Sequence, residues 1–129
     1  MMLRWLPVLL WIAVILGLSS IPSLGTSRQL LPGIDKLVHM GVYSVLGFLF
    51  SRAAWRMPVR VAWKVVLPAA LFGLLVGSAD EWYQRSVPGR DSDPLDAVAD
   101  IIGASLGGLF WLRRQRRLAN TDDLRRSTR

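Results

Sequence analysis

The sequence contains no cysteine and a single histidine, His39. Without thiols the chain forms no disulfide, offers no thiolate to a metal and has no cysteine nucleophile. A structural zinc site takes four Cys or His ligands, so the sequence argues against one. A catalytic or metal site in this chain must therefore use carboxylates with at most one imidazole.

Charged residues are almost absent from four long stretches of the 129-residue chain. A helix needs roughly 20 predominantly apolar residues to cross a bilayer. The four stretches predict membrane spans over residues 3–22, 34–52, 61–80 and 95–112. The predicted fold is therefore all-α: a four-helix transmembrane bundle formed by residues 1–112, followed by a basic cytoplasmic tail, residues 113–129.

The first stretch has a second interpretation. Met1 to Arg4 followed by an apolar run also resembles a signal peptide, and Ser23-Leu24-Gly25 offers small residues for cleavage. Removal of this segment would leave the orientation of the other three spans unchanged.

Basic residues are distributed unevenly over the connections between spans. Twelve of the 16 Lys and Arg residues lie before the first span, between the second and third, or after the fourth. They are Arg4, Arg52, Arg56, Arg60, Lys64, Arg113, Arg114, Arg116, Arg117, Arg125, Arg126 and Arg129. Such an excess marks the cytoplasmic side, so we expect a multi-pass protein of the bacterial inner membrane with both termini in the cytoplasm. The same placement accounts for the net charge of +7 without nucleic acid as a partner.

A dense polar segment, residues 80–90, separates the third and fourth spans. Ionisable side chains are costly at bilayer depth and mark functional sites there. The charge distribution places this segment on the external side. Together with polar residues in the second and fourth spans, it predicts a polar pocket in the outer half of the membrane.

Helical periodicity places these polar residues on the same faces as glycines. Residues four, seven and eleven positions apart share one narrow face of a helix. The residues with this spacing are Gly73, Gly77, Asp80 and Gln84 in the third span, Asp96, Asp100, Gly103 and Gly107 in the fourth, and Asp35, His39 and Tyr43 in the second. Glycines in this spacing let membrane helices approach closely, so the three faces should point into the bundle. Glu81 lies about 80° from the face of the third span and is expected at the edge of the pocket.

These polar elements occur in a recognisable order. They are Asp35-Lys36-x-x-His39 with Tyr43, Asp80-Glu81-x-x-Gln84, Pro88-Gly89-Arg90, and Asp93-x-x-Asp96-x-x-x-Asp100-x-x-Gly103. In order and spacing this set resembles the VanZ-like family of small bacterial membrane proteins. The resemblance implies several membrane helices and a place in the cell envelope. The family is named after a member linked to low-level teicoplanin resistance, and the resemblance implies no particular reaction.

The pocket residues suit acid–base chemistry. His39, Glu81 and Asp96 are the candidate catalytic residues, because imidazole and carboxyl groups donate and accept protons, and we expect Asp35 to orient His39. Arg90 follows Pro-Gly and offers a guanidinium fork for a phosphate or carboxylate. The candidates for substrate binding are Asp35, Tyr43, Asp80, Gln84, Arg90 and Asp100. The expected partners are membrane lipids and an anionic lipid headgroup or a cell-wall intermediate.

The same side chains also suit a divalent cation. Several carboxylates with one imidazole fit Mg²⁺, Mn²⁺ or Zn²⁺, and the external side carries more acidic than basic residues. The sequence leaves the identity of such a metal open and gives evidence of no other cofactor.

A structural role for the polar residues is the alternative. Buried charges in membrane helices pair with one another. The residues that could hold the helices together in this way are Asp35, Lys36, Glu81, Arg85, Arg90 and Asp96. We expect Lys36 and Arg85 to have only this role and to extend toward the headgroups. The protein would then be a non-enzymatic scaffold, a homo-oligomer or a subunit of an envelope complex. A transporter is less well supported, because Ser44 and Ser78 are the only polar candidates on the cytoplasmic side of the pocket.

Overall fold

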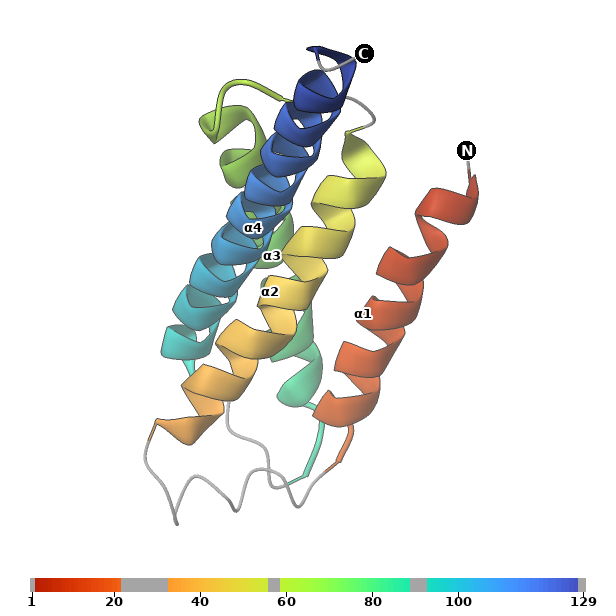
Figure 1. The fold of residues 1–129 in the computed structure, drawn as a ribbon. Coiled ribbons are helices and arrows are strands. Elements are labelled where there is room, and N and C mark those ends of the chain that lie inside the picture. Colours follow the sequence, from red (N-terminus) through yellow and green to blue (C-terminus); the bar gives the residue numbers. More distant parts are fainter. Residues whose placement is uncertain (1, 22–32, 56–58, 89–92, 128–129) are drawn as a thin grey trace.

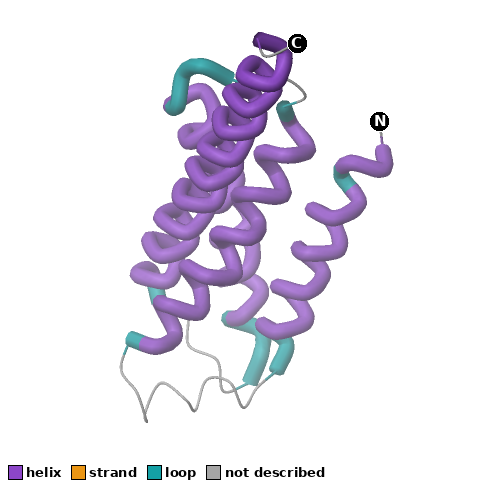
Figure 2. The backbone as a smooth tube through the Cα atoms, in the orientation of Figure 1, coloured by secondary structure: helices purple, strands orange, loops and turns teal. Residues whose placement is uncertain are grey.

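The computed structural model describes residues 2–21, 33–55, 59–88 and 93–127. They form a short 3-10 helix and four α-helices, and the described residues contain no strand (Figure 2). The elements are η1 (Met2–Arg4), α1 (Leu6–Ser19), α2 (Ile34–Ala54), α3 (Trp63–Gln84) and α4 (Pro94–Ser127). The predicted all-α fold with four helices is confirmed.

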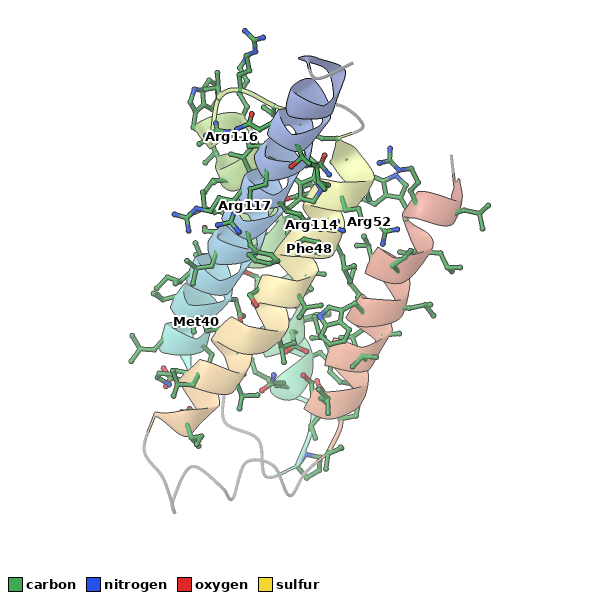
Figure 3. The ribbon with its side chains drawn as sticks, in the orientation of Figure 1. Met40, Phe48, Arg52, Arg114, Arg116 and Arg117 are labelled. Atoms are coloured by element: carbon green, nitrogen blue, oxygen red, sulfur yellow. The ribbon has the colours of Figure 1, made fainter. Side chains whose placement is uncertain are left out.

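Successive helices run in opposite directions, so that η1 and the last turns of α4 lie at the same end of the molecule (Figure 1). Arginines gather at this end, which we call the basic end. The Arg4 guanidinium donates to the carbonyl oxygens of Arg52 (2.8 Å) and Trp55 (3.2 Å), and that of Arg116 donates to the carbonyl oxygen of Arg60 (2.6 Å). In Figure 3, Arg116 lies near this end and Met40 toward the opposite one.

Large apolar side chains cover the outside of the helices, whereas small ones fill much of the inside. Exposed residues on α2, α3 and α4 include Leu37, Val38, Leu67, Leu71, Leu75, Leu95, Val98, Leu106 and Phe110. Ala69, Ala99 and Ala104 are buried, together with several glycines. An exposed apolar surface of this extent is unusual for a soluble protein and suits contact with lipid.

Three helices are long and apolar enough to cross a membrane: Ile34–Ala54, Trp63–Gln84 and the Pro94–Thr121 part of α4. α1 is apolar but shorter than the sequence predicts, since its 14 residues span about 21 Å. It ends at Ser19, three residues before Pro22, because proline disfavours helical conformation in the residue before it. α4 continues through Arg113 to Ser127, so the predicted basic tail begins as an extension of the last helix.

Glycines bring α4 into backbone contact with α2. A Cβ atom at Gly103 would overlap the carbonyl oxygen of Met40, and one at Gly107 would overlap that of Ser44. On α3, the glycine face also meets α4, where a Cβ at Gly77 would overlap the carboxylate of Asp100. The predicted faces of α3 and α4 are therefore buried against each other and against α2.

Candidate functional site

The polar residues gather where α1 and α3 end and where α2 and α4 begin, at the end opposite the basic end (Figure 1). We call this the polar end. Four of its carboxylates are buried: Asp80, Glu81, Asp96 and Asp100. Among the residues whose burial is described, no Lys or Arg is buried to the same degree. Among these residues, the interior of the polar end therefore contains more buried acidic side chains than buried basic ones.

His39 lies between two of these carboxylates. Its Nδ1 atom is 2.9 Å from Oδ1 of Asp100, and its Nε2 atom is 4.0 Å from Oδ2 of Asp96. The ring stacks parallel to that of Tyr43, one turn deeper in α2, at an interplanar angle of 6°. Asp100 therefore orients His39, a role that the sequence assigns to Asp35.

Asp35 instead belongs to a second group organised by Lys36. The Lys36 ammonium donates to Asp35 at 3.2 Å, to Asp93 at 2.8 Å and to Asp96 at 3.0 Å. Lys36 thus ties the start of α2 to the start of α4. The sequence predicts a structural role of this kind for Lys36 but does not identify its three partners, because these carboxylates lie within its reach only once the two helices are packed.

Asp80 and Gln84 form a third group with α1. Ser19 donates through its hydroxyl to Oδ2 of Asp80 at 2.9 Å, and the Gln84 amide donates to the same oxygen at 2.8 Å and to the Ser19 hydroxyl at 3.2 Å. Ser19 is not among the residues predicted from the sequence. Its spacing from Val8 and Ile15, the other buried residues of α1, places it on the inward face of that helix and could have identified it.

Glu81 is buried rather than at the edge of the pocket. Its Oε2 atom accepts a hydrogen bond from the backbone N–H of Asp93 at 3.1 Å. Its Oε1 atom is buried without a hydrogen-bond partner among the described residues, as are Oδ1 of Asp80, Oδ2 of Asp100 and the Tyr43 hydroxyl. Unsatisfied buried polar atoms are rare and costly, and four of the five among the described residues lie at the polar end, where they could accept hydrogen bonds from water or a ligand or bind an ion.

Two sets of three residues have the spacing of metal ligands. One atom from each of His39, Glu81 and Asp96 lies within 4.8 Å of the others, and the same holds for Asp35, Asp93 and Asp96. The second set surrounds Lys36. Of the residues predicted from the sequence, Arg90 falls outside the described residues, and the other eight all lie at the polar end.

Comparison of the chain with protein-family models, with curated proteins and with solved structures finds no match. The assignment of a function therefore depends on the chemistry of the polar end. A histidine held by a carboxylate can act in proton transfer. The unpartnered oxygens can accept hydrogen bonds from hydroxyl or amino groups, or they can bind a cation.

Proposed function

We propose that this chain is a VanZ-like protein of the bacterial inner membrane that binds or processes an anionic lipid headgroup or a lipid-linked cell-wall intermediate. Both termini lie in the cytoplasm, and the polar end faces outward in the outer half of the membrane. The collection of Arg4, Arg52, Arg60 and Arg116 at the opposite end supports this orientation, because basic residues remain on the cytoplasmic side.

The observation that carries the proposal is the set of unpartnered oxygen atoms around His39. Buried acceptors without a donor are uncommon where polar groups only hold helices together. Glu81 offers such an acceptor beside a histidine already oriented by Asp100. A headgroup that enters from the outer leaflet would bring hydroxyl, amino or phosphate groups to these atoms.

The hydrogen-bonded groups that join pairs of helices favour a second function, that of a non-enzymatic scaffold. Lys36 with its three carboxylates and Ser19 with Asp80 and Gln84 connect all four helices. A scaffold, alone or in an envelope complex, would need these contacts for stability and would not need Glu81 Oε1.

Mass spectrometry of envelope lipids and wall precursors separates the two functions. The strains carry a deletion, the wild-type chain, Glu81→Gln or Tyr83→Phe, with the three proteins at matched abundance. Tyr83→Phe is the control, because it removes a hydroxyl from an exposed side chain in the same turn of α3. A species that accumulates in the deletion and Glu81→Gln strains alone supports the proposal, whereas identical profiles in all four strains support the scaffold.

A further inference from the structure

We propose that His39, Glu81 and Asp96 bind one divalent cation of the Mn²⁺ or Zn²⁺ class between α2, α3 and α4. Only the role given to this cation, to hold the phosphate of a headgroup, rests on the proposed function. Its binding rests on the positions of the three side chains.

The orientation of His39 suits a metal ligand. Histidines that bind metals usually donate their other ring N–H to a carboxylate, which fixes the tautomer and the direction of the free nitrogen. Nδ1 of His39 contacts Asp100 at 2.9 Å, and this leaves Nε2 to face Asp96. The distance of 4.0 Å from Nε2 to Oδ2 of Asp96 is too long for a hydrogen bond, so the two atoms are neighbours without bonding to each other.

The spacing of the three ligands leaves room for an ion. Their donor atoms lie within 4.8 Å of one another, whereas tetrahedral ligands at about 2.1 Å from Zn²⁺ are about 3.4 Å apart. Closure by about an ångström would complete the coordination, and side-chain rotation can supply it. The remaining positions would be open to water or to the oxygen of a ligand, as in catalytic metal sites.

A second and independent observation comes from the atoms around this set. Glu81 is 8 % exposed and Tyr43 is 1 % exposed, yet Glu81 Oε1 and the Tyr43 hydroxyl have no hydrogen-bond partner in the described parts of the chain. The Tyr43 ring stacks on that of His39, with the ring centroids 6.2 Å apart, which places Tyr43 beside the histidine of the set. A cation with bound water at this position would give a partner to both atoms.

Charge also distinguishes the proposed metal site from the second set of possible metal ligands. Asp35, Asp93 and Asp96 already surround the Lys36 ammonium, at 2.8–3.2 Å, which occupies the place that a metal would take. His39, Glu81 and Asp96 contain no such ammonium. A divalent ion there would offset the repulsion among four buried carboxylates, which would otherwise also repel an anionic headgroup.

One imidazole and two carboxylates favour Mn²⁺ or Zn²⁺ over Mg²⁺, which prefers oxygen ligands alone. Bound in this way, the ion can polarise a phosphoryl oxygen and hold a headgroup in place. Mn²⁺ is the better probe, because it is paramagnetic and its binding can be followed directly.

The test is electron paramagnetic resonance of Mn²⁺ added to the full chain, purified in detergent with an affinity tag that contains no histidine. Because His39 is the only histidine, labelling of histidine with ¹⁵N reports on this residue without any substitution. We expect one bound Mn²⁺ per chain, with a nitrogen coupling that changes from the ¹⁴N to the ¹⁵N pattern on labelling. The absence of binding, or of a nitrogen coupling, would overturn the proposal whether or not a lipid substrate is found.

Variants add a second comparison, with folding checked by size-exclusion chromatography and helical circular dichroism. Glu81→Gln keeps the size of the side chain and removes its charge, so Mn²⁺ binding should weaken by about tenfold or more. Asp93→Asn, in the set that surrounds Lys36, should bind as the wild type does. The reverse result, with Asp93→Asn weakened and Glu81→Gln unchanged, would contradict the proposed site and place the ion at Lys36.

Discussion

Each of the four buried carboxylates contacts a different kind of partner. Asp80 accepts from Ser19 and Gln84, Glu81 from a backbone N–H, Asp96 from Lys36, while Asp100 contacts His39. Two of these partners, Lys36 and His39, come from α2, and the Ser19 partner comes from α1. Substitution of one partner should therefore disturb one carboxylate and leave the others in place, which allows their contributions to be separated.

Ser19→Ala should lower stability by about 1–2 kcal/mol, because it removes a hydrogen bond from the buried Asp80 carboxylate. The neighbouring Ser20→Ala is the matched control. Ser20 is exposed and contacts the carbonyl oxygen of Leu16 and, at 2.9 Å, the hydroxyl of the exposed Tyr83. Because water can replace these solvent-exposed contacts, its loss should be small. Thermal unfolding in detergent measures both variants. Equal losses of stability in the two variants would mean that the Ser19–Asp80 hydrogen bond stabilises the fold no more than the contacts of Ser20 do.

Lys36→Met should lower stability by about 2 kcal/mol, between the values for exposed and for buried ion pairs. The side chain is 29 % exposed, which reduces the effect through solvent screening, but its removal takes one charged hydrogen-bond donor away from the buried Asp96. Lys64→Met, at the exposed start of α3, should change stability little. The same unfolding experiment applies, and an unchanged melting temperature for Lys36→Met would show that Lys36 does not hold α2 to α4.

The packing of whole helices depends on glycines at particular depths. Gly107→Ala should strongly destabilise the chain, because the new Cβ would overlap backbone atoms of Ser44 and Phe48 and force α2 and α4 apart. We expect a loss of about 3 kcal/mol or more, as for overpacked cores. Gly41→Ala is the control, since no atom lies within 4 Å of a Cβ at that position. It should be neutral or should stabilise α2 by up to about 1 kcal/mol through helix propensity.

Protein yield, chromatographic behaviour and thermal unfolding distinguish these two glycine variants. Similar behaviour of both would indicate that α2 and α4 can separate without cost, and the close contact would then not define the bundle. A selective loss for Gly107→Ala would show that contact of the helix backbones positions His39 opposite Asp100.

Helix content and the inward faces of α3 and α4 could be predicted from the sequence, because apolar length and the 3.6-residue period act within one helix. The prediction that Asp35 orients His39 was wrong, because the partner of His39 depends on how α2 and α4 are aligned along the axis of the bundle. Asp35 lies one turn from His39 on the same helix, yet Asp100 occupies the position beside its ring. That pairing depends on where the α4 glycines meet α2, and no pattern within α2 contains this information.

The end of α1 and the role of Ser19 were also not predictable from the sequence pattern. Hydropathy predicted a span to residue 22, whereas the helix ends at Ser19, where the chain approaches proline. Hydropathy averages over a window and so does not detect a helix end of this kind. The role of the Ser19 hydroxyl is to donate a hydrogen bond to Asp80. Asp80 is 61 positions away in the sequence, so a pattern within α1 does not reveal this contact.

The orientation proposed for the whole molecule depends on its two unlike ends. Arginines occupy one end and buried carboxylates the other, and basic residues are retained on the cytoplasmic side. The absence of cysteine makes every introduced cysteine a unique reporter of position. Ser86 and Thr121 are exposed residues near the polar end and in the extension of α4, respectively, so they suit this experiment.

In intact cells whose outer membrane admits the reagent, a maleimide that cannot cross the inner membrane should label Ser86→Cys. Thr121→Cys should react only after the inner membrane is permeabilised. The physical reason is a difference in free energy. Moving the arginines of the basic end across the bilayer costs more than moving the short polar connection after α3. Labelling of Thr121→Cys alone would reverse the orientation. The acidic pocket would then open toward the cytoplasm, and a headgroup of the inner leaflet would replace the proposed external ligand.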